Sequence, residues 1–99
     1  MLNIVTIVGR IIEIEDSENY TTIKVGINRT YKNEETGKYD VDFIKCKING
    51  KMSDNVKEYL SVGDLIGIRG RLESEGENIK LVADKISFLS SKKEGENNE

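Results

Sequence analysis

The sequence contains no histidine and a single cysteine, Cys46. A zinc site needs three or four Cys, His or carboxylate ligands, and an acyl-transfer triad needs a base, so these absences argue against both kinds of centre. Cys46 has no partner for an intramolecular disulfide, and a lone cysteine fits a reducing compartment. We therefore expect a protein that is not an enzyme and that carries neither a metal nor another cofactor.

Long apolar stretches are missing as well. No run approaches the roughly 18 apolar residues of a membrane span, and no cationic segment precedes an apolar one at the N-terminus. At 99 residues the chain has the size of one small domain. Its net charge of −3 gives no global basic character, so a nucleic-acid partner must be argued from where the charges lie. These features predict one well-hydrated, cytoplasmic domain with no membrane association.

Branched aliphatic residues dominate the apolar content, because valine and isoleucine total 20 against 9 for alanine, leucine and methionine together. Branched side chains suit a pleated sheet and lose rotamers in a helix, so we expect a mainly β protein. Apolar periodicity and turn signals predict strands at 2–15, 21–28, 43–48, 64–73 and 78–89. In the first of these, Gly9 is expected to mark a bend or bulge. Its apolar residues also predict self-association through an unpaired edge.

A short helix is predicted at 53–60, between the third and fourth strands. Ser53 or Asp54 can cap its start, and Val56 and Tyr59 fall on its apolar face, so Tyr59 is expected in the core, as is Phe88 on the last strand. Three strands, a helix and two strands is the order of an OB-fold, a five-stranded Greek-key barrel that binds oligonucleotides or oligosaccharides. We predict this fold for residues 1–89, followed by a polar disordered tail at 90–99.

Several fragments resemble, in order and spacing, the bacterial single-stranded DNA-binding protein family. They are NIVTIVGR at 3–10, INRTYK at 27–32, DFIKC at 42–46, GK at 50–51 with YL at 59–60, and GD at 63–64 with GRL at 70–72. The resemblance covers about residues 2–89. It implies an OB-fold subunit that assembles, usually as a homotetramer and otherwise as a dimer, and that coats single-stranded DNA in replication, recombination or repair. In that family, aromatic residues on the second and third strands stack on bases, and Tyr31 and Phe43 fall at two such positions.

Three features depart from the family pattern. The chain has no tryptophan, and Asn49 stands where the family often places a further aromatic residue. The turn at 74–77 is much shorter than the family's DNA-contacting loop. The sequence ends without an acidic tip carrying a terminal Phe, so recruitment of repair proteins through the tail is not expected. A protein-interaction module, or a primosome-type accessory protein with weak nucleic-acid binding, remains the alternative function.

The sequence also places aromatic side chains next to basic ones in a pattern that suits nucleic-acid binding. Phe43, Lys45 and Lys47 share one face of the third strand, where a ring beside two ammonium groups can stack a base while neutralising its phosphates. Tyr31 lies in the polar stretch 29–40, which we predict to be a loop. Stacking and phosphate contacts serve DNA and RNA alike, so both polymers stay open. The predicted nucleic-acid-binding residues are Arg10, Arg29, Tyr31, Lys32, Phe43, Lys45, Lys47 and Lys51, with Arg69 and Arg71 in a second tier.

Overall fold

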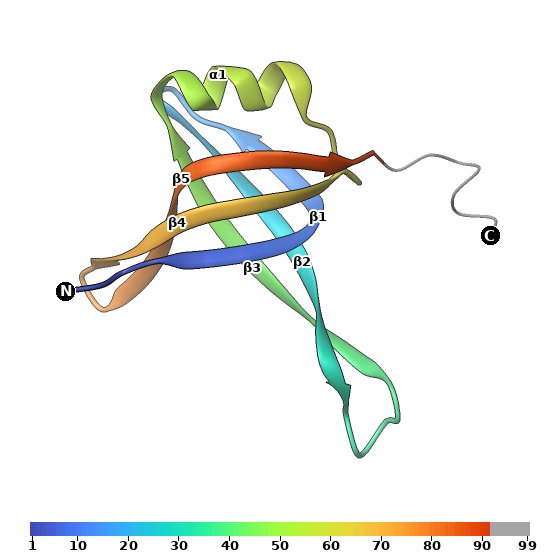
Figure 1. Ribbon diagram of the computed structural model, residues 1–99. Coiled ribbons are helices and arrows are strands. Elements are labelled where there is room, and N and C mark those ends of the chain that lie inside the picture. The colour runs from blue at the N-terminus through green and yellow to red at the C-terminus, as the bar shows by residue number, and fades with distance from the viewer. Residues whose placement is uncertain (92–99) are drawn as a thin grey trace.

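The alternating segments form five strands that close into a barrel, with one short helix packed beside it (Figure 1). The computed structural model describes residues 1–91. The elements are β1 (Val5–Asp16), β2 (Tyr20–Lys32), β3 (Tyr39–Asn49), α1 (Gly50–Tyr59), β4 (Leu65–Glu75) and β5 (Asn78–Ser90). The strand order around the barrel is β1-β2-β3-β5-β4, and the short β3–β5 contact is the parallel one. The predicted architecture is confirmed, whereas the predicted tail lies, from residue 92 on, outside the described residues.

The barrel interior is filled by branched aliphatic side chains from alternate strand positions. Those with the lowest exposure are Ile11, Ile23, Val25, Cys46, Ile48, Ile66 and Ile68. Burial raises the pKa of the Cys46 thiol to about 12, because an ionised sulfur would lose its hydration in this core. Cys46 therefore acts as a small apolar core residue. No helix among the described residues has the length and apolarity that a membrane span needs.

The helix begins earlier than the sequence pattern predicts. Helix α1 starts at Gly50, so Ser53 lies inside it and does not cap it. The Ser53 hydroxyl is buried and lies 2.5 Å from the hydroxyl of Thr21, itself fully buried on β2. This hydrogen bond satisfies both polar groups and fixes the first turns of α1 against β2, next to the apolar contact of Val56 with the core.

Two aromatic residues predicted to be in the core are exposed instead. Tyr59 keeps 70% of its surface accessible and Phe88 keeps 55%, so both predictions are wrong. Tyr59 is the last residue of the ten-residue helix, and the two rings line a groove between α1 and β5 together with Met52 and Ile86. The helix is too short to close that groove, which leaves both rings at its rim.

Strand β1 has a neighbour on each side, but each neighbour takes one half of it. Residues 5–10 pair with β4 and residues 10–16 pair with β2. The register shift lies between Ile11 and Glu13, so the predicted bulge at Gly9 is misplaced by a few residues. Gly9 is required by close approach, because a Cβ there would lie 2.6 Å from the carbonyl oxygen of Gly26. Each half of β1 thus has one edge that pairs with a neighbouring strand and one edge that does not, so the predicted unpaired edge is only partly present.

Strands β2 and β3 continue past the barrel as a two-stranded ribbon, here called the arm, which covers residues 29–43 and is prominent in Figure 1. The prediction of a loop over 29–40 is wrong, because only residues 33–38 form the turn. Both faces of the arm are exposed, so its residues lack the apolar alternation that marks a strand on a core. Gly37, with φ of 72°, and Asn33, which accepts hydrogen bonds from Glu35 N and Thr36 N, shape the turn.

Candidate nucleic-acid interface

The outer face of β1, β2 and β3 is organised in three cross-strand rows. Arg10, Gly26 and Phe43 are register partners in the first row, and Glu13, Lys24 and Lys45 in the second. The third row consists of Glu15, Thr22 and Lys47. The predicted outward direction of Phe43 is confirmed, since its ring is 60% exposed while Cys46 and Ile48 are buried. The sheet therefore presents acidic side chains on β1 and basic ones on β3.

A low apolar floor lies beside the Phe43 ring. Gly26 has no side chain on the outer face, and a Cβ placed there would lie 3.3 Å from the Ile12 side chain and 3.4 Å from that of Val41. Ile12 and Val41 are themselves exposed at 45% and 40%. Their side chains therefore cover Gly26 and, with the Phe43 ring, give a flat nucleobase an apolar surface to stack on.

Three lysines on β3 and at the start of α1 have little to neutralise them. Among residues 1–91, Lys45, Lys47 and Lys51 form no ion pair. Lys47 Nζ instead lies 4.5 Å from the centre of the Tyr20 ring. Lys45 faces Lys24 directly across the β2–β3 ladder, and Glu13 offsets the charge of Lys24 from the other side of the row. The positive charge of Lys45 is left for an anionic ligand.

A shallow cleft of about 220 Å³ continues from these lysines toward the β4–β5 hairpin. Tyr20, Lys45 and Lys47 line one side of it, and Lys80 lines the other. The Lys80 ammonium lies 3.3 Å from a carboxylate oxygen of Glu75. Residues 76–77 form the turn of this hairpin, and the paired strands behind it bring β5 alongside Cys46 and Lys47 of β3.

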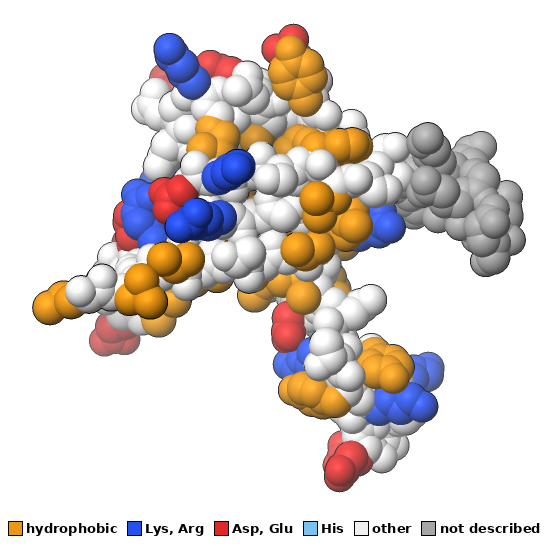
Figure 2. All heavy atoms as spheres, in the orientation of Figure 1, with side chains coloured by type: hydrophobic (Ala, Val, Ile, Leu, Met, Phe, Trp, Pro, Cys, Tyr) orange, Lys and Arg blue, Asp and Glu red, His pale blue; other side chains and the backbone are white. Residues whose placement is uncertain are grey.

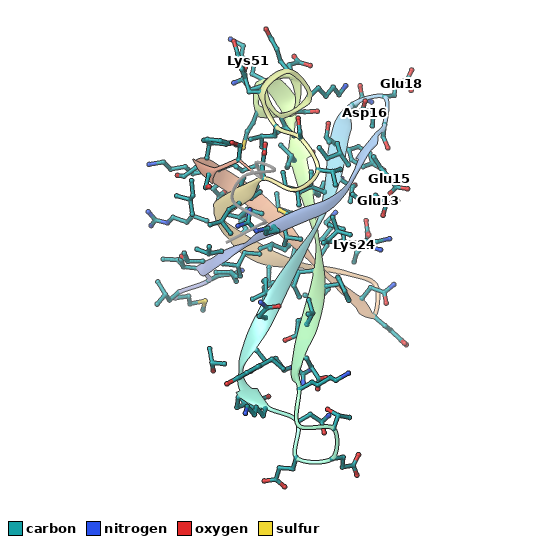
Figure 3. The ribbon with its side chains drawn as sticks, turned by 90° about the vertical axis from the view of Figure 1, so that its right-hand side faces the viewer. Glu13, Glu15, Asp16, Glu18, Lys24 and Lys51 are labelled. Carbon is teal, nitrogen blue, oxygen red and sulfur yellow. The ribbon has the colours of Figure 1, made fainter. Side chains whose placement is uncertain are left out.

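Acidic side chains mark the other side of this sheet face. Figure 3 shows Glu13, Glu15, Asp16 and Glu18 following β1 and the turn after it, with Lys24 next to them on β2. Lys24 Nζ lies 3.6 Å from a Glu13 carboxylate oxygen. The acidic column repels phosphates, so a polyanion on this face is confined to the β3 side.

Lys51 is carried by α1 and not by the strand rows. It is exposed in the first turn of the helix, where Figure 3 shows it apart from the acidic column. Its ammonium adds positive charge at the end of β3 that follows Lys47. The structure therefore places Lys51 at the start of the helix that directly follows the strand of Lys45 and Lys47.

The arm adds exposed rings. Tyr31 is 63% exposed and Tyr39 is 54% exposed, and Figure 2 shows hydrophobic and basic side chains side by side along the arm, with acidic ones at its tip. Lys32 is the register partner of Tyr39, and its ammonium lies 5.9 Å from the centre of that ring. Tyr31 follows Arg29 by two residues, in the part of β2 where its register against β3 shifts. The structure thus places Tyr31 on the arm, beyond the regular ladder that carries Phe43.

Charge is divided unevenly between the arm and the sheet below it. Residues 29–43 carry three basic side chains against four acidic ones. Residues 20–28 and 44–51 together carry four lysines and no acidic side chain. The excess positive charge that the sequence indicates for 20–51 therefore lies on the barrel, while the arm supplies rings.

Arg29 is engaged within the arm. Its Nε and Nη2 donate to the Asp42 carboxylate at 2.8 to 3.2 Å, and its Nη1 lies 3.9 Å from an Asp40 oxygen. These bonds raise the pKa of Arg29 further above its usual value, and the hydrogen bond from Arg29 lowers the pKa of Asp42. The free guanidinium expected at Arg29 is thus paired.

The remaining predicted arginines are not gathered beside Phe43. Arg10 heads the Phe43 row, but its Nη1 donates to the Gly63 carbonyl at 3.0 Å. Arg69 and Arg71 are on β4, which neighbours β1 and β5 across the barrel from the β2–β3 face. Arg71 is paired with both Glu73 and Asp84. Of the first-tier residues, the geometry therefore favours Phe43 and the lysines Lys45, Lys47 and Lys51, with the arm next to them.

Comparison with known proteins adds an independent finding. The model of the single-strand binding protein family matches residues 2–88. The chain belongs to this family. It is 36% identical over 114 residues to single-stranded DNA-binding protein 1 of Staphylococcus aureus strain COL, an alignment that covers 98% of the chain but 66%, just under two thirds, of that relative. Single-stranded DNA-binding protein 2 of the same strain is 35% identical over 107 residues, covering 93% of this chain and 76% of the relative.

Solved structures share the barrel. A small single-stranded DNA-binding protein from Mycoplasma pneumoniae superposes with a TM-score of 0.70 at 19% identity, covering 87% of this chain and 92% of the other. A Plasmodium falciparum SSB in complex with single-stranded DNA gives a TM-score of 0.70 at 15% identity, covering 91% and 96%. At these identities the likeness establishes the family's fold for this chain.

Sequence reasoning missed the floor beside Phe43. Gly26, Ile12 and Val41 were not among the predicted binding residues, although the alternation of β2 already assigns Gly26 to the outer face. A glycine at an outward strand position, opposite an outward aromatic residue, is the signal that would have found it. The bulge that turns Ile12 outward has no such signal, because it depends on the register between β1 and β2.

Proposed function

We propose that this chain binds single-stranded DNA without reading its sequence. Phe43 stacks a base on the Gly26 floor, while Lys45, Lys47 and Lys51 neutralise phosphates along β3. The observation that carries this proposal is the exposed Phe43 ring in line with lysines that form no ion pair within residues 1–91. Stacking and backbone neutralisation are both indifferent to base identity, since every base has a π-face and every nucleotide a phosphate.

The arm extends the contact. Tyr31 offers a second stacking surface and Lys32 a further cation near the Tyr39 ring. Arg10 contributes from the end of the Phe43 row, and Arg29, Arg69 and Arg71 contribute less because of their partners or their place on the barrel. The strand then runs from the arm, across Phe43, toward the cleft beneath the β4–β5 hairpin.

The protein works without catalysis in this proposal, as a coat that protects strands exposed by replication, recombination or repair. Binding, and no turnover, is what rings and lysines on an open sheet can perform. Membership of the single-strand binding family supports this role.

We also propose that the chain acts as a homo-oligomer, with the tetramer usual in its family as the expected state. Residues 5–9 of β1 pair only with β4, so their other edge is open to a strand from a second copy. On the wall of β1, β4 and β5, Val8 and Leu89 are each 50% exposed on either side of Gly67. Figure 2 shows this wall with hydrophobic side chains at its surface. A symmetric contact would cover them and leave the β2–β3 face free.

A second candidate is a protein-interaction module with weak nucleic-acid binding. The groove between α1 and β5, with Tyr59 and Phe88 exposed on its rim, favours it. The first candidate places single-stranded DNA on the β2–β3 face, whereas the second places a protein partner in the groove between α1 and β5.

Titration with unlabelled poly-dT while tyrosine emission is followed separates them. Stacking next to Tyr31 and Tyr39 quenches the emission, and the midpoint moves to higher DNA concentration as salt is raised. A protein-interaction module leaves the emission unchanged at every salt concentration. Light scattering on the free protein and the saturated complex then gives the number of subunits and the site size, and a parallel titration with poly-U compares RNA with DNA.

A further inference from the structure

One arginine of the arm is paired with the arm's own carboxylates. Arg29 presents its Nε and Nη2 edge to Asp42 in a bidentate pair, with distances of 3.2 and 3.1 Å from Nε and 2.8 Å from Nη2. Its remaining Nη1 lies 3.9 Å from Asp40, beyond hydrogen-bond distance. Asp40 is in turn held by Asn33, whose amide nitrogen donates to it at 3.1 Å. Asp42 thus occupies the bidentate edge of this guanidinium, with a second carboxylate nearby.

The pair lies next to Tyr31. Arg29 and Tyr31 are two residues apart on β2, and Tyr31 is close enough to contribute to the raised pKa of the Arg29 guanidinium. Asp42 directly precedes Phe43 on β3 and so points away from the Phe43 side. The Phe43 ring therefore leads to lysines that form no ion pair within residues 1–91, whereas the Tyr31 ring leads to a paired arginine.

Phosphate binds arginine through the same bidentate edge that Asp42 occupies. A nucleotide stacked on Tyr31 would bring its phosphate toward Arg29, and that phosphate would meet the Asp42 carboxylate already in place. The side chains of the pair are 39% and 43% exposed, so the contact is screened by solvent and open to exchange. Asp40 adds a second negative charge at the same point.

We propose that Asp42 is a built-in competitor of the bound strand: it holds the Arg29 guanidinium against phosphate and thereby lowers the affinity and the salt dependence of single-stranded DNA binding. This inference rests on the proposed function. In it, the Tyr31 face of the arm is a weak subsite because of one carboxylate, and the Phe43 face is the strong one. Replacing that carboxylate converts the weak subsite into a second strong one.

The test measures oligo-dT affinity by fluorescence anisotropy over a series of salt concentrations. Asp42→Asn keeps the shape of the side chain and removes its charge. One newly neutralised phosphate steepens the slope of log K against log salt by about 0.7, which makes the variant about fivefold tighter than the wild type at ~0.1 M salt if the two coincide at ~1 M. Tyr31→Ala should then weaken binding more in the Asp42→Asn background than in the wild type.

Two controls assign the effect to Arg29. The double variant Arg29→Ala/Asp42→Asn removes both charges of the pair and should bind with the wild-type affinity and slope. Glu58→Gln is a charge change of the same sign on α1, where Glu58 is exposed and forms no ion pair within residues 1–91, and it should leave binding unchanged. Thermal unfolding of each variant reports whether the fold is intact, and the exposed position of Asp42 on the arm predicts that it is.

The outcomes separate the inference from the function beneath it. A folded Asp42→Asn protein that binds as the wild type does, or more weakly, overturns the competitor role while the wild type still binds. A gain that persists in the double variant also overturns it, because Arg29 would not be the source. A wild-type protein that fails to bind oligo-dT at low salt removes the proposed function and the inference together.

Discussion

Replacing Phe43 with alanine should weaken single-stranded DNA binding strongly while leaving the fold intact. The ring is 60% exposed, so its removal takes little from the core and should change the free energy of unfolding by about 0.5 kcal/mol or less. Base stacking on an aromatic side chain contributes about 1–3 kcal/mol per base, which corresponds to roughly 5- to 150-fold in Kd for each subunit engaged. The lower half of this range is expected, because Ile12 and Val41 stay beside the Gly26 floor and keep an apolar contact for the base.

The measurement is the anisotropy of a labelled oligo-dT at one fixed salt concentration, with urea unfolding of each variant in the same buffer. Phe43→Trp keeps a stacking ring and should bind at least as tightly as the wild type. Phe88→Ala is the matched control, because Phe88 has a similar exposure of 55% but lines the groove beside α1. Equal losses for Phe43→Ala and Phe88→Ala, or no loss for either, would refute the assignment of stacking to the β2–β3 face.

Further predictions concern charge, close packing and the buried thiol. Lys45→Gln and Lys47→Gln should each make the salt slope of log K shallower by about 0.7, whereas Lys85→Gln on the opposite wall should leave it unchanged in the same titration. Gly26→Val should displace the Ile12 and Val41 side chains, which lie 3.3 and 3.4 Å from the added Cβ, and so remove much of the roughly 1–3 kcal/mol of stacking; tight binding by a folded variant would contradict the floor's role. Gly70→Ala places a Cβ 2.2 Å from the Val82 carbonyl oxygen and should destabilise the barrel by roughly 1–3 kcal/mol or more in urea. The pKa of Cys46 is raised from 9.0 to about 12, so the unfolded chain loses the thiol proton first, and stability should fall as pH rises from 9 to about 12. Cys46→Val should show a smaller decline over that window, measured as unfolding free energy against pH.

The barrel was predictable because most of its strands lie on a core. Alternation over 21–28 and 43–48 follows from one buried face, and the buried Ile23, Val25, Cys46 and Ile48 confirm it. The arm was not predictable in the same way, since residues with solvent on both faces carry no period. The helix start was missed for a related reason: a serine ahead of an apolar run is typical of a cap, and only the fold brings Thr21 to Ser53.

The sequence predicts which candidate binding residues share the outer face of β3, but it does not predict the surface around them. The parity of β3 is enough to place Phe43, Lys45 and Lys47 together, and the structure confirms that shared face. The partners of Arg29 and Arg71 depend on carboxylates that the register brings across from other strands. Tyr59 and Phe88 share the periodicity of core residues, but the ten-residue helix leaves them uncovered. Periodicity predicts the side of a strand or helix to which a side chain points. Whether other residues bury that side chain or pair with its charge depends on elements distant in the chain.

The rings on the arm and the lysines on the barrel lie apart, and this separation affects how salt releases a bound polymer. Added ions weaken attraction between lysine and phosphate but have little effect on stacked π-faces, so the two anchors respond to different conditions. A strand on this subunit would loosen first at its sugar-phosphate chain while its bases stay seated on the protruding hairpin. A rise in salt would therefore free the polymer from the barrel before it frees the polymer from the arm.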